Sequence, residues 1–295
     1  MALPHIGLAL LVNFIWGFSF VAAKIAMDQY SPLLFTSMRF ILVALFLAPY
    51  LKIVPGRMKF VLSIAMLVGV THFTFLYLGL NTAGGVSAVA ITIQLVAPFS
   101  LIMAVIFLKE TIRWRRIVGL LLAFIGVMVL GFDPIVFDHL SSAMLVATAA
   151  LCMAGGIVLM RQAIGIGAMQ MQAWIALFSF PILLSFSFVF EEGQVTQIMS
   201  SNWESVLALL FTVVATTIVA HGTWYYLLQK YPISVLTPYG LLAPLFGVCF
   251  GVLLYDEPLT WKFMLGGAIT LAGVLIINLR NAEKQSKPLQ TSSGL

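Results

Sequence analysis

Long apolar runs alternate along the chain with short stretches that carry charge, glycine or proline. Each run approaches the roughly 20 residues that an α-helix needs to cross a bilayer. The strict alternation of an outer-membrane β-barrel is absent. The pattern predicts ten transmembrane helices, near Ile6–Met27, Pro32–Leu51, Phe60–Leu80, Val86–Leu108, Arg115–Phe132, Leu140–Met160, Met169–Phe190, Trp203–Leu228, Ile233–Tyr255 and Trp261–Leu279.

The composition supports this prediction and limits the classes of protein. Of 295 residues, 62% are hydrophobic and only 8% are charged. Ten spans with short loops use nearly the whole chain, which leaves no room for a sizeable soluble catalytic domain. We therefore expect an all-α integral membrane protein.

The basic residues fall at the ends of the predicted helices. Twelve of the 15 Lys and Arg residues lie in loops on one side, whereas the other side has only Lys24 and Lys262, and Arg39 lies within a span. Cytoplasmic loops carry the excess of positive charge. We expect a multi-pass protein of the bacterial cytoplasmic (inner) membrane with both termini cytoplasmic, and the net charge of +5 then implies no nucleic-acid partner.

The two halves of the sequence are related. An offset of 147 residues superposes Lys109-Glu110 on Asp256-Glu257, Trp114 on Trp261, Gly119 on Gly266 and Gly126 on Gly273, and an offset of 149 superposes His72 on His221 and Tyr77 on Tyr226. Each half has five spans, an odd number, so the halves enter the membrane from opposite sides. The predicted fold is ten transmembrane helices as two inverted five-helix repeats, residues 1–133 and 134–280, followed by a polar cytoplasmic tail, residues 281–295.

Four stretches of the chain resemble a known family. They are Trp16-Gly17 with Lys24, Leu34–Arg39, Ala97-Pro98 through Lys109-Glu110, and Ala243-Pro244 through Asp256-Glu257 with Gly266 and Gly273. Across roughly residues 6–280 the chain resembles the drug/metabolite transporter superfamily, specifically its EamA-type two-repeat members. The resemblance implies a ten-helix exporter of amino acids and related metabolites, with a pathway lined by spans 1, 3, 4, 6, 8 and 9. The sixth span departs from the family pattern, with Met153 where a tryptophan often stands.

Two histidines lie near the expected midplane of the membrane. By helix rise, His72 and His221 are each roughly 12 Å from opposite faces. Histidine in a membrane is costly unless it faces protein or water, and it titrates near neutral pH. We predict that both line the transport pathway. Proton coupling and simple hydrogen bonding between helices remain alternatives.

Aromatic and uncharged polar residues supply further candidates for substrate binding. Amphipathic rings can wall a cavity and stack on a substrate, and amides deep in apolar runs can bind a zwitterion or hydrogen-bond to a neighbouring helix. The candidates are Trp16, Tyr77, Trp174, Trp224, Tyr226 and Tyr239, with Asn13 and Gln94.

A second group of residues is expected to act in structure or gating. Arg39 lies about 10 Å below the outer helix end, where a structural or gating role is favoured over capture of a substrate carboxylate. Pro98 and Pro244 are expected to kink the fourth and ninth spans. Glu110 and Glu257 are expected to cap the fifth and tenth helices, which follow them. The glycine pairs seven residues apart permit close helix packing, within one chain or across a dimer.

The sequence thus favours a secondary transporter that exports small metabolites, amino acids above all, by alternating access. It contains no Walker-type loop, no H-E-x-x-H and no G-x-S-x-G, so we expect no enzyme, no cofactor and no metal. The expected partners are a small-molecule substrate and the lipid bilayer, for a monomer or homodimer. Three alternatives remain. Transport of nucleoside- or nucleotide-like metabolites would need a strongly basic cavity, and a lipid-modifying enzyme would need clustered acid and base groups. The third is a non-transporting scaffold.

Overall fold

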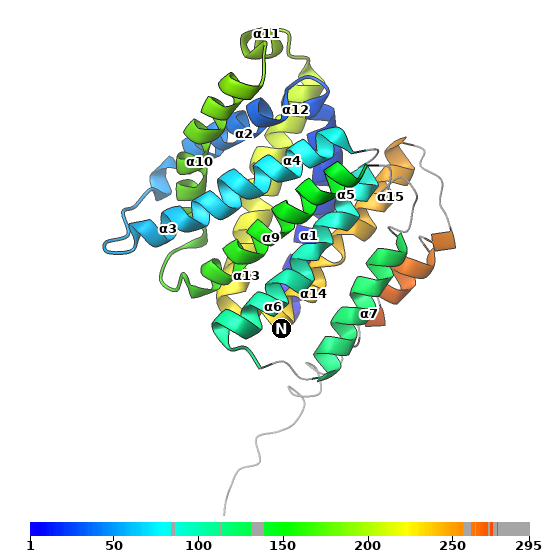
Figure 1. Ribbon diagram of the computed structural model, residues 1–295. Coiled ribbons are helices and arrows are strands. Elements are labelled where there is room, and N and C mark those ends of the chain that lie inside the picture. The colour runs from blue at the N-terminus through cyan, green and yellow to red at the C-terminus, as the bar shows by residue number, and fades with distance from the viewer. Residues whose placement is uncertain are drawn as a thin grey trace, which may run out of the picture.

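The computed structural model describes residues 1–83, 86–111, 114–130, 139–255, 261–262, 264–270, 272–273 and 276. Throughout these residues the regular elements are helices (Figure 1). In chain order they are α1 (Leu3–Met27), α2 (Pro32–Phe46), η1 (Ala48–Tyr50), α3 (Met58–Ile64), η2 (Ala65–His72), α4 (Phe73–Thr82), α5 (Val86–Thr92), η3 (Ile93–Leu95), α6 (Val96–Leu108), α7 (Trp114–Leu130), α9 (Leu140–Gln162), α10 (Ala168–Phe190), α11 (Gln194–Met199), α12 (Trp203–Phe211), η4 (Thr212–His221), α13 (Gly222–Lys230), α14 (Ile233–Gly240) and α15 (Ala243–Tyr255).

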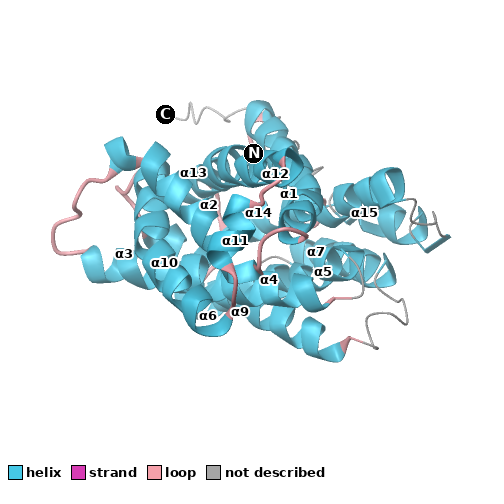
Figure 2. Ribbon diagram, turned by 90° about the horizontal axis from the view of Figure 1, so that it is seen from above, coloured by secondary structure: helices cyan, strands magenta, loops and turns pink. Residues whose placement is uncertain are grey.

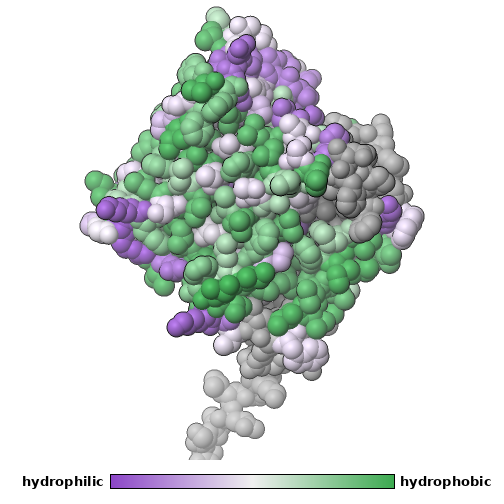
Figure 3. All heavy atoms as spheres, viewed as in Figure 1, coloured by the Kyte–Doolittle hydropathy of each residue, from purple (hydrophilic) through white to green (hydrophobic). Residues whose placement is uncertain are grey.

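Five helical stretches of the described residues are long and apolar enough to cross a membrane: Leu3–Met27, Met58–Thr82, Leu140–Gln162, Ala168–Phe190 and Trp203–Lys230. Large apolar side chains are exposed on the outside of the bundle, and Figure 3 shows them as a broad band with hydrophilic residues gathered toward its edges. Water does not tolerate so large an apolar surface, whereas lipid does. The protein is therefore a multi-pass membrane protein.

Several expected spans consist of more than one element. The third joins α3, η2 and α4, the eighth joins α12, η4 and α13, and the ninth is divided into α14 and α15. The second ends at Phe46 rather than at Leu51, because Pro49 has no backbone N–H and its ring excludes the carbonyl of the preceding turn. The expected tenth span lies partly outside the described residues. Within that span, residues 261–262 and 264–270 are described and helical.

The helices α2 and α10 join the two halves of the chain along one side of the bundle (Figures 1 and 2). At one end, the Glu191 carboxylate accepts hydrogen bonds from the backbone N–H groups of Leu33 (2.7 Å) and Leu34 (3.0 Å). It also accepts from the hydroxyls of Ser31 (2.8 Å) and Ser187 (2.7 Å). The carboxylate thus satisfies the free N–H groups of α2 at the positive end of the helix dipole.

This cap predicts a stability difference between two adjacent acids. Glu191→Ala removes all four hydrogen bonds, and we expect it to lower the free energy of unfolding by about 1–3 kcal/mol. Glu192→Ala, an exposed neighbour, is expected to change little. Thermal unfolding of the purified protein in detergent measures both, and equal melting temperatures for the two variants would contradict the assignment.

Small residues let helices approach closely within one chain. A Cβ atom built on Gly126 of α7 would lie 2.5 Å from the backbone nitrogen of Thr270 and 2.6 Å from the carbonyl oxygen of Gly266. Such distances leave no room for a side chain. The close packing predicted from these glycines is therefore present between α7 and residues 264–270 of the same chain.

Candidate functional site

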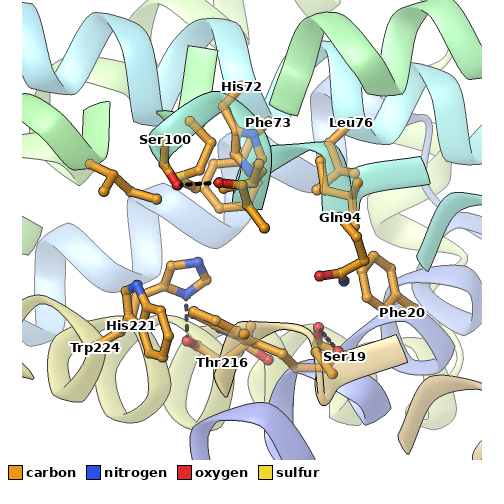
Figure 4. Close-up of a pocket in the computed structure, with 18 of the residues that line it drawn as sticks. Ser19, Phe20, His72, Phe73, Leu76, Gln94, Ser100, Thr216, His221 and Trp224 are labelled. Atoms are coloured by element: carbon orange, nitrogen blue, oxygen red, sulfur yellow. Dashed lines mark hydrogen bonds between the residues drawn. The ribbon is translucent and has the colours of Figure 1, made fainter. Parts of the chain in front are cut away.

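A cavity of about 140 Å³ lies between the two halves (Figure 4). We call it the central cavity. Residues of α1, α2, η2, α4, η3, α6, α9, η4, α13, α14 and α15 surround it. The lining residues are Trp16, Ser19, Phe20, Arg39, His72, Phe73, Leu76, Tyr77, Ile93, Gln94, Val96, Ala97, Ser100, Met153, Ile157, Thr216, His221, Trp224, Tyr225, Gly240 and Ala243.

Two π-helices border this cavity at corresponding places in the two halves. One, η2, ends at His72, and the other, η4, ends at His221. A π-helix is rare, and it frequently marks a functional site. Hydroxyls satisfy the loosened backbone: Thr71 donates to the carbonyl of Leu67 and Thr217 to that of Thr212, both at 2.8 Å. Irregular backbone is tolerated at membrane depth where it lines a cavity, so the geometry fits a pathway.

Both histidines are held by backbone carbonyl groups. His72 donates from Nδ1 to the carbonyl of Ala149 (2.9 Å), and His221 donates from Nδ1 to that of Thr216 (2.7 Å). Each ring must donate here because a carbonyl oxygen can only accept. Both side chains are buried, and Figure 4 shows them on opposite walls of the central cavity. The structure therefore brings these two sequence candidates to one site.

Arg39 is fully buried beside the same cavity. Its Nε donates to the Thr217 hydroxyl (2.7 Å), and one terminal amino group donates to the Tyr77 hydroxyl. Its Cζ atom lies 4.5 Å from the centre of the Phe73 ring, a cation–π contact. The other terminal amino group finds no partner among the described residues. Because Tyr77 is in the first half and Thr217 in the second, Arg39 links the halves at the cavity.

Aromatic rings form the wall opposite His72. The ring centres of Trp16 and Trp224 are 5.0 Å apart, and that of Trp16 is 5.3 Å from that of His221. Tyr225 also lines the cavity, although the sequence pattern singled out its neighbour Tyr226. Tyr226 corresponds to Tyr77 in the repeat, and each lies five residues after the histidine that ends a π-helix. Tyr77 lines the cavity and Tyr226 does not, so the two halves differ at these positions.

Four other candidates lie away from the central cavity. Asn13 is buried and donates to the carbonyl of Ala9 (2.6 Å), and Trp174 donates to that of Lys52 (3.0 Å). Tyr226 is 39% exposed and borders a separate hollow of about 510 Å³. Tyr239 is buried in the core outside the cavity lining. The helices that carry Asn13, Tyr226 and Tyr239 contribute other residues to the lining, whereas α10, which carries Trp174, contributes none among the described residues.

The two prolines stand where the fourth and ninth spans break. Pro98 is in the first turn of α6, directly after η3, and Pro244 is in the first turn of α15. A proline in a first turn displaces no helical hydrogen bond. Gln94 and Ala97 at the first break, and Gly240 at the second, line the central cavity. The breaks are therefore part of the cavity wall.

Glu110 caps a helix in addition to any that was predicted from the sequence. Its carboxylate accepts from the backbone N–H groups of Ile233 (3.1 Å) and Ser234 (3.3 Å), the first residues of α14. The acid therefore caps a helix of the other half, because the fold places the α14 terminus beside it. Glu257, predicted to cap the tenth helix, lies outside the described residues.

Comparisons with known proteins agree with this architecture. The EamA-like transporter family matches residues 3–132 and again residues 140–279. The chain is 28% identical to a "Probable amino-acid metabolite efflux pump" of Escherichia coli (strain K12) and 29% identical to a protein of that name from Salmonella typhimurium, in both cases over 91% of this chain and 93% of the relative.

A solved crystal structure superposes with a TM-score of 0.76 over 97% of this chain and 100% of the other, at 16% sequence identity. That likeness supports the fold alone. The family match covers both halves of the chain, and each match spans one predicted repeat of helices. The chain belongs to the EamA-like transporter family of the drug/metabolite transporter superfamily, and it is a membrane transporter and not an enzyme.

Proposed function

We propose that this protein exports small metabolites, in the first place amino acids, across a bacterial cytoplasmic membrane by alternating access of its two halves. The observation that carries the proposal is the central cavity, bordered by two matched π-helices that end at His72 and His221. Inverted repeats place substrate sites near the midplane, in broken helices at the repeat interface. Two relatives named as probable amino-acid metabolite efflux pumps support the substrate class and the direction.

The size and charge of the central cavity favour an amino acid over a nucleotide-like metabolite. Its volume of about 140 Å³ is close to the roughly 150 Å³ of an engineered protein cavity that holds benzene. A nucleotide is several times larger and carries phosphates that need a strongly basic site. Among the described lining residues, Arg39 alone carries a formal charge when the histidines are neutral.

Counterflow of radiolabelled amino acids into proteoliposomes tests the proposal. Saturable exchange of at least one amino acid is the expected result. In a separate labelling experiment in cells, we expect both termini to be accessible from the cytoplasmic side. The same vesicles with an imposed pH gradient distinguish proton coupling, which drives accumulation, from facilitated diffusion, which does not. Absence of exchange by every amino acid, with folded protein in the vesicles, would contradict the proposal.

His72→Ala is expected to reduce exchange at least about tenfold, because it removes a ring from the cavity wall and its bond to α9. His139→Ala, an exposed histidine before α9, is the matched control and is expected to exchange normally. Initial rates normalised to folded protein provide the comparison. Equal rates for the two variants would remove His72 from the pathway.

A further inference from the structure

We propose, on the basis of transport through the central cavity, that the cavity recognises its ligand by the carboxylate group and does not require an amine. Small monocarboxylates, including amino acids and their deaminated counterparts, then bind, whereas amines and amides of the same shape do not. Three buried donors carry this assignment: Arg39, Trp16 and Thr216.

Arg39 supplies a buried positive charge that the described protein does not balance with an anion. Both of its hydrogen-bonded partners, Tyr77 and Thr217, are neutral hydroxyls, and none of the described cavity-lining residues is acidic. Taking an unpaired guanidinium out of water costs several kcal/mol. A carboxylate in the cavity would offset that cost, and the planar guanidinium matches carboxylate geometry better than any other side chain. Its remaining amino group is free to donate.

Two further donors in the same lining also lack a partner. The indole Nε1 of Trp16 and the hydroxyl of Thr216 are buried atoms without a hydrogen bond among the described residues. Buried donors are rarely left unpaired, since each costs about 1–3 kcal/mol. Unpaired donors in a cavity wall indicate a ligand that accepts hydrogen bonds.

The three donors line one cavity and are linked to one another through a chain of intermediate residues. Thr217, which binds Arg39, is the neighbour of Thr216. Arg39 contacts the Phe73 ring, whose centre is 5.8 Å from that of His221, and His221 in turn contacts Trp16. Figure 4 shows Phe73 facing His221 and Thr216 across the cavity. All three donor residues therefore line one small cavity, of about 140 Å³, in which a carboxylate ligand would meet them.

An ammonium group finds weaker complementarity in the same cavity. Gln94 donates from Nε2 to the carbonyl of Ala90 (3.1 Å), which leaves its Oε1 as an acceptor. This acceptor is neutral, so it can accept a hydrogen bond from an ammonium group but cannot balance its charge. The cavity thus compensates a negative charge and not a positive one.

Competition with three ligands of one shape tests the proposal. L-leucine, L-leucinamide and 4-methyl-2-oxopentanoate are added in excess to the counterflow of the labelled amino acid. L-leucine and 4-methyl-2-oxopentanoate, which have a carboxylate, are expected to inhibit the counterflow. L-leucinamide, which keeps the amine but lacks the carboxylate, is expected not to inhibit it. Inhibition by the amide equal to that by the oxo acid, or no inhibition by either carboxylate, overturns the proposal.

A pair of matched variants ties the effect to the donors. Thr216→Val removes the unpaired hydroxyl in the cavity, whereas Thr74→Val removes one that is buried and unpaired but outside the lining. We expect the half-inhibitory concentration of 4-methyl-2-oxopentanoate to rise at least about tenfold in Thr216→Val and Trp16→Phe. It stays unchanged in Thr74→Val. If the Thr216 hydroxyl has only a structural role, the half-inhibitory concentration should be the same in both threonine variants. That result would overturn the assignment.

Direct binding separates this proposal from the proposed function. The melting temperature of the detergent-solubilised protein is measured with and without 4-methyl-2-oxopentanoate. A rise in the unaltered protein and in Thr74→Val, but not in Thr216→Val, supports carboxylate binding even if no amino acid exchanges in vesicles. In the opposite outcome, amino acids exchange, but the oxo acid neither inhibits the exchange nor raises the melting temperature. That result keeps the transport function and overturns the carboxylate selectivity.

Discussion

Arg39→Gln is expected to reduce exchange of any carboxylate substrate about 10- to 100-fold while the protein still folds. One charge-assisted hydrogen bond contributes about 1.5–3 kcal/mol, and the substitution also removes the charge that attracts the anion. Folding is expected to survive because a neutral amide costs less to bury than a guanidinium and can still bond the hydroxyls of Tyr77 or Thr217.

The control for Arg39 is another arginine that bonds across the fold. Arg57 donates to the carbonyls of Gln162 and Ile164 at the exposed end of the bundle. Arg57→Gln is therefore expected to keep the exchange rate. Arg39→Lys separates charge from geometry: it keeps the charge but loses the planar fork, so the substrate concentration at half-maximal rate should rise. An Arg39→Gln protein with the normal rate would exclude a substrate role for this residue.

Gly17→Ala is expected to lower the free energy of unfolding by about 1–3 kcal/mol, because it overfills the contact between α1 and α15. A Cβ atom at Gly17 would lie 2.5 Å from Cβ of Phe246, 2.9 Å from the backbone nitrogen of Gly247 and 3.0 Å from the carbonyl oxygen of Ala243. Two of these atoms are backbone, so no side-chain rotation can make room. The helices must separate, and since Ala243 lines the central cavity, exchange should fall as well.

Gly7 is the matched control in the same helix. No atom of the described residues lies within 4 Å of a Cβ atom built there, and alanine favours a helix over glycine by about 1 kcal/mol. Gly7→Ala is therefore expected to leave the melting temperature in detergent unchanged or to raise it. A Gly17→Ala protein as stable as Gly7→Ala would show that α1 and α15 tolerate a wider separation.

Much of the candidate site could be predicted from residue type and depth. His72, Trp16, Gln94, His221 and Trp224 line the central cavity, as expected for polar or amphipathic residues in the middle of apolar runs. Their type alone indicates an environment other than lipid. Whether each binds substrate stays a prediction that the exchange measurements test.

Other parts of the site depend on helix phase. The extra residue of a π-turn rotates the following side chains by roughly 100°, the angle of one helical residue. The apolar sequence shows no break at either π-helix, so it does not indicate which side chains there face the cavity. Tyr225 and Thr216 line the cavity and were not among the candidates. The recurring threonine hydroxyls near each histidine, Thr71 and Thr217, were the available signal, since they bond the loosened carbonyls.

By itself the sequence determined that this is a multi-pass helical membrane protein made of two related halves. A bilayer requires long apolar segments, and that requirement is local, so it is visible in the order of residues. The order of residues does not show that Glu110 caps α14, or that Arg39 bonds Tyr77 and Thr217 and has no charged partner among the described residues; the packed bundle does. These contacts join segments that are far apart in the chain, two of them from different halves, and the packing of the bundle, not any local pattern, sets which segments meet.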